Sequence, residues 1–531
     1  MKKFGVMLDC SRNAVLNVET VKKHIDNLNE MGFNMLMLYT EDTYEVNNEK
    51  MFGYLRGKYS KEELKEIDKY AQSKNVELIP CVQTLAHLNQ IFRWDEYGVI
   101  NDVNDILLVD DERTYKLIDN IFNTLSECFT SRNVNIGMDE AHMLGLGRYL
   151  TLHGYHHRME LLLRHLNKVN DIAKKYGFTI MMWSDMFFSI ATNGGYYDYD
   201  RFTLTEDVKK LVPQGIKLIY WDYYHQDKNV YDSMLSCHEQ FDNDICFAGG
   251  IWTWTGFAPQ NRFTINATKA AMSSVKEHKD IDTIIMTHWK DNGGECSFFA
   301  TLPSLFYAKE IYNNITDEKQ IKKDFYDTFK IKFDYFMNFD LLNVVDDKDN
   351  YGLTNACKYM LYNDPFLGFN DYTVMGNEVN FLRKNAKKIL NAKGKMKEYD
   401  YLCDYYSSLA KLLSYKYDLG VNTRKAYKDS NKEELRKVIR KYTYTIKYLK
   451  EFINCFRIAW FKENKPHGFD VQEIRLGGLL LRLESCKARL IDFTNGKINK
   501  IEELEEEIIP LGKKQPKEAN VYQTMSTVNV I

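Results

Sequence analysis

Eight short apolar runs, separated mostly by longer amphipathic segments, occupy the first three hundred residues of this 531-residue chain. The runs predict β-strands at residues 4–9, 34–39, 77–82, 133–137, 179–183, 217–221, 246–251 and 283–287. Helical spacing between them predicts helices at 18–31, 62–74, 113–128 and 155–175. Strands that alternate with helices form parallel sheets with crossover connections. Eight of them favour a closed (β/α)₈ TIM barrel; a doubly wound sheet is the alternative, but no Gly-rich G-x-G-x-x-G turn follows the first strand.

The pattern changes at about residue 314, where β-type runs stop and helical spacing takes over. Long helices are predicted at residues 378–390, 399–417, 432–456 and 474–493. We therefore expect a catalytic barrel at 1–313 and an α-helical domain at 314–531, with a tail that lacks its own fold from about 510. The Tyr- and Leu-bearing helices suit either a homodimer or packing within one chain.

Composition narrows the classes of ligand. Lys and Arg total 71 against 74 for Asp and Glu, so a formal charge of −3 offers no broad footprint for nucleic acid or an anionic membrane. No stretch approaches the roughly 18 apolar residues of a membrane span. The 36 Tyr, 30 Phe and 7 Trp suit a carbohydrate ligand, because aromatic faces stack on the apolar faces of sugar rings.

Cysteine and histidine usage bears on compartment and metals. The 10 cysteines are scattered without a C-x-x-C pair, and Asp9 and Arg12 interrupt the apolar start before it reaches the length of a signal-peptide core. A cytoplasmic protein with reduced thiols is the expectation. The histidines at 153–157 lack the acidic or cysteine partners of a closed zinc site, so neither a metal nor a cofactor is expected.

Polar and aromatic residues follow all eight predicted strands, at the barrel end where active sites lie. Taken singly, an acidic residue after a strand more often caps a helix, and a lone Trp more often packs. The joint pattern instead predicts a sugar-binding site. Its residues, in chain order, are Arg12, His87, Asp139, Glu140, Trp183, Trp221, Tyr223, Tyr224, Trp254, Trp289 and Asp291.

The adjacent carboxyls Asp139 and Glu140 are the most specific feature. Two carboxyls held close together cannot both ionise cheaply, so one serves as an acid while the other stays charged. A retaining glycosidase ordinarily places its nucleophile about 5 Å from the acid, across the sugar. Neighbours on one strand end cannot flank the bond in that way. An N-acetyl group at C2 of the substrate can supply the nucleophile instead, through an oxazolinium intermediate.

These residues resemble glycoside hydrolase family 20, the β-N-acetylhexosaminidases. Residues 137–140 resemble its Gly-x-Asp-Glu signature and residues 9–12 its Asp-x-Ser-Arg. Residues 84–87 resemble its Thr-x-Gly-His, with Ala86 in place of glycine, and residues 289–291 its Trp-Gly-Asp, with Lys290 in place of glycine. Residues 138–142 and 468–476 further resemble a bacterial subgroup with a helical domain after the barrel, and the family's usual leading α/β domain is expected to be absent.

The resemblance implies a role for each predicted site residue. Glu140 would be the acid, with its pKa raised by partial burial, and Asp139 would orient the acetamido group. Arg12 would grip sugar hydroxyls, Asp291 those at C4 and C6, and His87 would support the site. The acetamido pocket would be formed by Trp183, Trp221 and Trp289, with Tyr223 or Tyr224 bonding the acetamido oxygen. Trp254, after the seventh strand, is expected at the same rim.

The implied activity is exo-acting release of terminal β-linked GlcNAc or GalNAc from an oligosaccharide or glycoconjugate. Two alternatives stay open. One is a sugar-binding barrel that has lost catalysis. The other is an O-GlcNAc hydrolase like those of family 84. Asp110 and Asp111 imitate the adjacent aspartates of that family, although capping of the next helix explains the pair better.

Overall fold

The computed structural model describes residues 2–278, 281–344, 353–509 and 521–530. Eight parallel strands close into a barrel with the neighbour order β1-β10-β9-β8-β7-β6-β3-β2. This confirms the predicted (β/α)₈ fold. The strands are β1 (Lys3–Asp9), β2 (Met35–Tyr39), β3 (Glu77–Cys81), β6 (Asn133–Asn135), β7 (Thr179–Trp183), β8 (Lys217–Asp222), β9 (Asp244–Gly250) and β10 (Thr283–His288).

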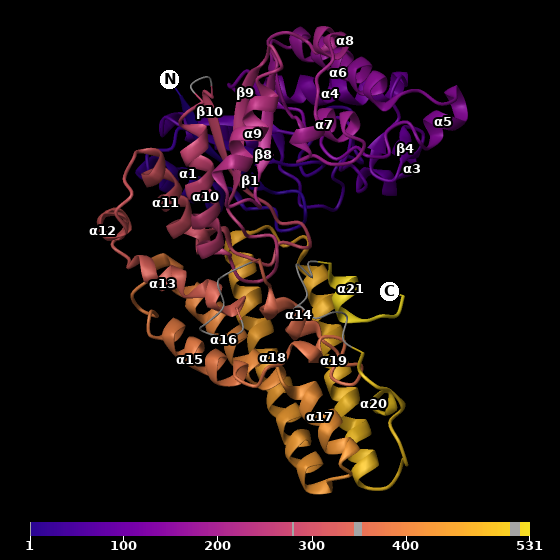
Figure 1. The fold of residues 1–531 in the computed structure, drawn as a ribbon, viewed down its shortest axis with the longest axis vertical. Coiled ribbons are helices and arrows are strands. Elements are labelled where there is room, and N and C mark those ends of the chain that lie inside the picture. Colours follow the sequence, from indigo (N-terminus) through magenta and orange to yellow (C-terminus); the bar gives the residue numbers. More distant parts are fainter. Residues whose placement is uncertain (1, 279–280, 345–352, 510–520, 531) are drawn as a thin grey trace.

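Helices surround the barrel, as Figure 1 shows. They are α1 (Val18–Glu30), α2 (Lys61–Ser73), α3 (Asp95–Gly98), α4 (Glu112–Cys128), α5 (Arg148–His153), α6 (Arg158–Lys175), α7 (Asp185–Ala191), α8 (Glu206–Leu211), α9 (Lys228–His238), α10 (Asn261–Val275) and α11 (Leu302–Tyr312). Local sequence fixes several starts. Ser60 and Glu63 form a reciprocal capping box at α2, which satisfies two backbone N–H groups of its first turn.

The barrel strands are buried on both faces, which explains their nearly continuous apolar sequences. Side chains such as Met7, Met37, Ile79, Ile219 and Ile285 pack together in one cluster with the tryptophans of the rim. A small antiparallel pair, β4 (Asn101–Val103) and β5 (Ile106–Leu107), lies between β3 and α4 and was not predicted.

The helical domain follows α11. It contains α12 (Glu318–Phe329), α13 (Phe333–Met337), α14 (Ala356–Tyr362), α15 (Glu378–Leu390), α16 (Asp400–Lys416), α17 (Leu419–Lys428), α18 (Lys432–Glu463), α19 (Phe469–Thr494), α20 (Glu502–Glu505) and α21 (Tyr522–Ser526). Figure 1 shows α18 and α19 running side by side away from the barrel. Among the described helices, none is long and apolar enough to cross a membrane.

The connection between α18 and α19 contacts the barrel directly. Lys465 N donates to Val15 O at 2.7 Å, and Asn17 N donates to Glu463 O at 3.0 Å, while Leu16 and Asn464 form an isolated antiparallel bridge. The first barrel loop and the helical domain are therefore joined by backbone hydrogen bonds, next to the predicted site residue Arg12.

The C-terminal end differs from the expected tail. Residues 510–520 lie outside the described part of the chain, but α21 beyond them is held against the protein. Tyr522 N donates to Asn292 Oδ1 at 3.0 Å, and the Met525 side chain is buried. One backbone hydrogen bond and one buried apolar side chain therefore anchor α21 to the rest of the protein.

Candidate active site at the barrel rim

A narrow cavity of about 180 Å³ opens at the carboxyl end of the barrel, and we call it the aromatic slot. Every predicted site residue except His87 lines it. The lining residues are Arg12, Asp139, Glu140, Trp183, Trp221, Tyr223, Tyr224, Trp254, Trp289 and Asp291. The structure thus brings together residues that follow six different strands, as expected for a barrel site.

The backbone after β6 turns sharply to present the two carboxyls. Gly137, Met138 and Glu140 have φ angles of 75°, 68° and 52°, a region that costs free energy for residues other than glycine. A Cβ on Gly137 would lie 2.0 Å from Gln83 Oε1, so only glycine fits there. The Glu140 N–H donates to Asp185 Oδ2 at 2.9 Å, which helps hold the turn.

Asp139 is buried, and each of its carboxylate oxygens has one partner in the protein. Its Oδ1 accepts from Gln83 Nε2 at 2.7 Å, and its Oδ2 lies 3.2 Å from His87 Nε2. Burial alone would raise the pKa of Asp139, but the opposing charge of His87 and the hydrogen bonds from His87 and Gln83 lower it below its usual value. Asp139 is therefore ionised at neutral pH.

His87 supplies the counter-charge. Burial disfavours its protonated form, yet attraction to Asp139 raises the pKa of His87 to about 9. At neutral pH the imidazole is positively charged and faces both carboxyls, since Nε2 also lies 3.6 Å from Glu140 Oε2. His87 lies beside the slot and acts on it through Asp139.

Glu140 differs from expectation. Partial burial was predicted for this residue, but its side chain is 50% exposed, whereas that of Asp139 is 11% exposed. The sharp turn after β6 explains the difference, because it directs one carboxyl inward and leaves the next at the mouth of the slot. An open position suits a group that exchanges protons with a leaving group and with water.

A third carboxyl, Asp185 at the start of α7, lies behind the pair. Burial and repulsion from Asp139 raise the pKa of Asp185 to about 8. Its Oδ1 accepts from Trp221 Nε1 at 3.3 Å, while Oδ2 accepts from Glu140 N. Asp185 thus connects the acidic turn to one wall of the slot.

Aromatic rings form the walls. The Trp183 and Trp289 ring centroids are 6.0 Å apart, and Tyr223 stacks on Trp221 at 5.2 Å and meets Trp254 edge-on at 5.6 Å. A Cβ on Gly250, at the end of β9, would lie 2.8 Å from the Trp254 ring. Glycine at this point allows the ring to close the slot.

The two tyrosine candidates are in different environments. Tyr223 is 6% exposed and packs between Trp221 and Trp254, whereas Tyr224 is 40% exposed at the edge. Since the buried hydroxyl is the better placed of the two to reach the inside of the slot, Tyr223 is the stronger candidate for the acetamido contact.

Arg12 lies between two acids at the other side of the slot. Its Nη1 is 3.0 Å from Asp291 Oδ1 and its Nη2 is 3.3 Å from Glu41 Oε1, while the guanidinium carbon lies 5.3 Å from the Trp289 ring centre. Burial raises the pKa of Glu41 to about 7 and that of Asp291 to about 6, although Arg12 opposes both shifts.

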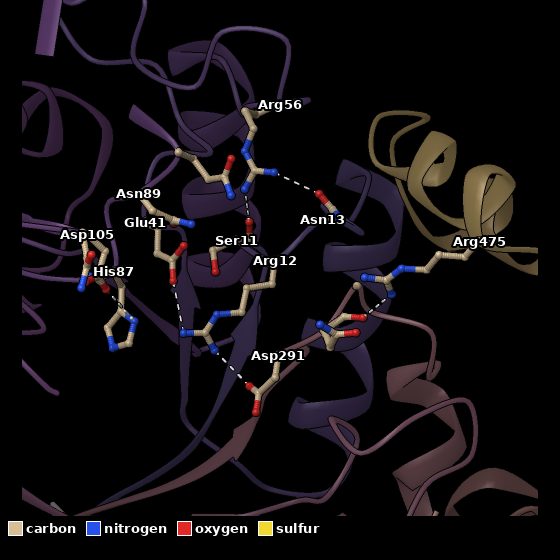
Figure 2. Close-up of a pocket in the computed structure, with 14 residues that line it drawn as sticks. Ser11, Arg12, Asn13, Glu41, Arg56, His87, Asn89, Asp105, Asp291 and Arg475 are labelled. Carbon is tan, nitrogen blue, oxygen red and sulfur yellow. Dashed lines mark hydrogen bonds and ion pairs between the residues drawn. The ribbon is translucent and has the colours of Figure 1, made fainter. Parts of the chain in front are cut away.

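A larger cavity of about 550 Å³ adjoins the slot, and we call it the polar cavity. Arg12 and Asp291 line both spaces, and His87 lines the polar cavity instead of the slot. Figure 2 shows Arg12 between Glu41 and Asp291, with His87 to one side and Arg475 of α19 to the other.

The helical domain holds the loop after β10, which carries Asp291. Arg475 Nη1 donates to Asn292 O at 2.7 Å, and Gln472 Nε2 donates to Gly293 O at 3.0 Å. Lys290, where family members have glycine, is buried and donates from Nζ to Ala14 O at 2.8 Å. The lysine therefore ties this loop to the first barrel loop.

Three residues of the site were given no role from the sequence. Asp185 and Glu41 belong to the polar residues that follow strands five and two, but a single acid after a strand more often caps a helix. Gln83 lies two residues past β3 and matches no motif. Its contact with Asp139 depends on the approach of β3 to β6, which the chain shows only once folded.

Two competing sequence signals have structural explanations. Asp111 caps α4 by accepting from the backbone N–H groups of Arg113 and Thr114 at 2.9 and 3.3 Å, and Asp110 pairs with Arg164 at 2.6 Å. His157 caps α6 by accepting from Met159 N. Among the described residues, no group of three or more His, Cys, Asp or Glu side chains is arranged to hold a metal ion.

Two parts of the chain match the profiles of known protein families. Residues 4–236 match the profile of the glycosyl hydrolase family 20 catalytic domain, and residues 334–523 match that of the glycoside hydrolase 20C C-terminal domain. Hexosaminidase D of Bos taurus is 24% identical over 202 residues, which are 36% of this chain and 55% of that protein. The chain thus matches about half the length of this curated relative.

The solved structures that match the chain are more distant in sequence. A β-N-acetylhexosaminidase crystal structure is 14% identical with a TM-score of 0.47, over 61% of this chain and 75% of the other. The β-N-acetylhexosaminidase from Bacteroides fragilis is 18% identical with a TM-score of 0.44, over 58% and 65%.

The closed barrel and the match of residues 4–236 place the chain in a family of glycoside hydrolases. It belongs to glycoside hydrolase family 20, in the group whose barrel is followed by a 20C helical domain. The predicted membership of family 20 and the predicted helical domain after the barrel are both confirmed.

Proposed function

We propose that this chain is an exo-acting, retaining β-N-acetylhexosaminidase that releases terminal β-linked GlcNAc or GalNAc by substrate-assisted catalysis. The observation that carries the proposal is the pairing of a buried, charged Asp139 with an exposed Glu140 at the mouth of a tryptophan-walled slot. The names of the hexosaminidase relatives agree with this choice of substrate.

In the first step, the acetamido carbonyl oxygen of the substrate attacks C1. The C1–O bond to the leaving group breaks, and the leaving oxygen takes the proton of Glu140. Positive charge develops on the oxazolinium ring and its nitrogen. Asp139 accepts the acetamido N–H and stabilises that charge, because His87 and Gln83 keep its carboxylate ionised and fixed.

In the second step, Glu140 is a carboxylate and acts as the base. It takes a proton from water, the water oxygen bonds to C1, and the ring opens to restore the acetamido group. Two inversions at C1 give net retention. The walls contributed by Trp183, Trp221 and Trp289 hold the acetamido group beneath C1, while Arg12 and Asp291 bind hydroxyls at the opposite side.

Hydrolysis of p-nitrophenyl β-N-acetylglucosaminide tests the proposal. The native protein should release p-nitrophenol, and Glu140→Gln should lose about 100-fold or more in kcat because the proton donor is gone. Asp139→Asn should also be impaired although the acid survives. A substrate whose acetamido group is replaced by hydroxyl should not turn over, since it lacks the nucleophile.

The same assay separates the alternatives. A sugar-binding barrel without catalysis would show a higher melting temperature with N-acetylglucosamine but would release no p-nitrophenol. A nucleophile supplied by the protein would tolerate loss of the acetamido group. A family 84-like mechanism would depend on Asp110 and Asp111, so Asp111→Asn should abolish turnover in that case and leave it intact under our proposal.

The proposal includes a cytoplasmic location and a homodimer as parts still to be tested. All ten cysteines are free and nine are buried, which suits a reducing compartment. Light scattering of the full chain at several concentrations would distinguish a dimer from a monomer.

A further inference from the structure

Three buried polar side chains beneath the rim connect the two ends of the aromatic slot. Gln83 and Tyr39 are fully buried, and Glu41 is 4% exposed. Tyr39 and Gln83 line neither the slot nor the polar cavity, so they act on a ligand only through other residues. Buried polar groups need hydrogen-bond partners, and all three side chains have them within the protein.

The first two bonds involve the amide of Gln83. Its Nε2 donates to Asp139 Oδ1 at 2.7 Å and to the Tyr39 hydroxyl at 2.9 Å. Its Oε1 accepts from Met138 N at 3.2 Å, and a flipped amide would place this oxygen against the Asp139 carboxylate. The amide is therefore fixed in one orientation, in which Nε2 is the donor of both bonds.

The direction of the remaining bonds follows from this orientation. The Tyr39 hydroxyl accepts from Gln83, so its own proton is directed to Glu41 Oε1 at 3.0 Å. The same oxygen lies 3.3 Å from Arg12 Nη2, and Arg12 Nη1 lies 3.0 Å from Asp291 Oδ1. Figure 2 shows the Arg12 guanidinium between the two carboxyls. One oxygen of Glu41 thus serves both Tyr39 and Arg12.

The backbone at Glu41 is strained. Its φ angle is 44°, in the left-handed region that residues other than glycine seldom adopt. Such residues cluster at functional sites, where the surrounding contacts hold them in place. The Thr43 N–H donates to Thr40 O at 2.6 Å and closes the turn around Glu41. The turn thus places a carboxyl beneath the rim, within reach of both of its donors.

We propose that Glu41 is a positioning residue for both ends of the slot. It fixes Arg12 directly, and through Tyr39 and Gln83 it fixes Asp139. This inference rests on the proposed function, in which Arg12 binds sugar hydroxyls and Asp139 orients the acetamido group. The two ends of the sugar are then held in register by a continuous set of bonds within the protein.

Tyr39→Phe removes the one oxygen that joins the two ends. The ring keeps its edge-on contact with Trp289, whose ring centre lies 4.7 Å away. We expect kcat for p-nitrophenyl β-N-acetylglucosaminide to fall about tenfold, because Gln83 loses a buried partner and holds Asp139 less firmly. KM should change little, since the ion pairs of Arg12 remain.

Tyr44→Phe is the matched control. Tyr44 lies in the same loop as Glu41 and is buried, and its hydroxyl has no hydrogen-bond partner among the described residues. This variant should leave kcat and KM unchanged. Equal losses in Tyr39→Phe and Tyr44→Phe would indicate a general loss of packing and contradict the proposal. A native kcat in Tyr39→Phe would contradict it as well.

Substitutions of Glu41 separate its two contacts. Glu41→Gln keeps an oxygen that accepts from both Tyr39 and Arg12 but removes the charge, so kcat should stay near the native value while KM rises. Glu41→Ala removes the acceptor, so kcat should fall as in Tyr39→Phe and KM should rise too. Adding Tyr39→Phe to Glu41→Ala should lower kcat no further, because the connection is already broken. A second loss of equal size in the double variant would refute the connection.

Direct binding of the sugar by Glu41 would give a different pattern. Glu41 lines the polar cavity, which adjoins the slot. If its carboxyl acts only by binding a sugar hydroxyl, Glu41→Ala raises KM while Tyr39→Phe has no effect, and the proposal is wrong.

Failure of the proposed function is distinguishable from failure of this inference. If the native protein hydrolyses no substrate, the proposed function fails. The connection is then judged by calorimetry with N-acetylglucosamine-thiazoline, a stable analogue of the oxazolinium ring. Binding that is weakened by Tyr39→Phe but not by Tyr44→Phe supports the connection, and unchanged or undetectable binding overturns it.

Discussion

The His87–Asp139 ion pair gives a prediction that depends on geometry and not on knowledge of the substrate. His87 Nε2 lies 3.2 Å from Asp139 Oδ2, and this carboxylate raises the pKa of the imidazole from 6.5 to about 9 against the opposing effect of burial. The shift corresponds to about 3 kcal/mol that favours the charged imidazolium.

The perturbation is Asp139→Asn, which keeps the shape of the side chain and removes its charge. Burial then acts on His87 with its main counter-charge gone, so the pKa of His87 should fall from about 9 to 6.5 or below. At pH 7.5 the imidazole changes from charged to mostly neutral. A charge 3.2 Å away has become a neutral amide, and little else around the ring has changed.

The assay is an NMR pH titration of the protein labelled at the histidine Cε1 positions, with His87 assigned from the His87→Gln spectrum. Asp105→Asn is the matched control, because Asp105 Oδ2 lies 3.8 Å from His87 Nδ1 on the opposite side of the ring. A His87 pKa near 6.5 in the native protein would refute the reasoning. An equal decrease in the Asp105 variant would refute it as well.

Stability should follow the same titration. The pKa of His87 is raised in the folded protein, so its contribution is fully present below pH 6.5 and is lost as the pH rises through about 9. The contribution of His87 to the difference in unfolding free energy between the native protein and Asp139→Asn should therefore decrease by about 3 kcal/mol over that interval. Asp185 adds to the decrease, because its raised pKa falls when Asp139 loses its charge. Urea denaturation at pH 6 and pH 9.5 measures it.

Three further substitutions test the rest of the slot. Arg12→Lys should raise KM for p-nitrophenyl β-N-acetylglucosaminide about tenfold with a smaller change in kcat, since lysine cannot bridge two carboxylates in one plane; an unchanged KM would contradict the assigned role. Asp185→Asn should lower kcat, because the amide has one acceptor oxygen for the two N–H groups of Glu140 and Trp221, and full activity would show that one of these bonds is dispensable. Trp221→Phe removes the other bond to Asp185, so the double variant should lose less than the sum of the single losses in ΔΔG‡; simple additivity would argue against the connection.

Most strands and helices of the fold could be predicted from the periodicity of apolar residues. The fifth barrel strand was predicted at 179–183 and the helix at 378–390, and both bounds agree with β7 and α15. The predicted and observed bounds differ where tertiary contacts determine the end of an element. The fourth strand was expected to reach residue 137, but β6 ends at Asn135 because Gly137 and Met138 adopt positive φ angles to present the acids.

In the helical domain, one helix was predicted too short. The helix predicted at 432–456 continues to Glu463 in α18, since Trp460 packs on Phe456 and Phe469 and extends the apolar contact by two turns. Aromatic residues lower local helix propensity, so the sequence signal weakens where the packing is strong.

The site was predictable as a set of residues but not as an electrostatic arrangement. Sequence motifs predicted Asp139 and Glu140 as site residues. Which of the two is buried depends on the turn after β6, and no residue pattern predicts its conformation. The polar cavity was not predictable at all, because Arg475 lies 184 positions along the chain from Asp291 and joins the rim only through the packing of α19.

The buried Lys290 has a consequence for protein engineering. Its Nζ donates a hydrogen bond to the first barrel loop and lies 3.4 Å from Asn464 Oδ1 of the helical domain. Arg475 donates a hydrogen bond to the adjacent loop. A truncated barrel would expose this lysine's surroundings and release the loop after β10 that carries Asp291. The barrel alone is therefore a poor module for grafting or minimal expression, and a chimaera should exchange the barrel and the helical region together.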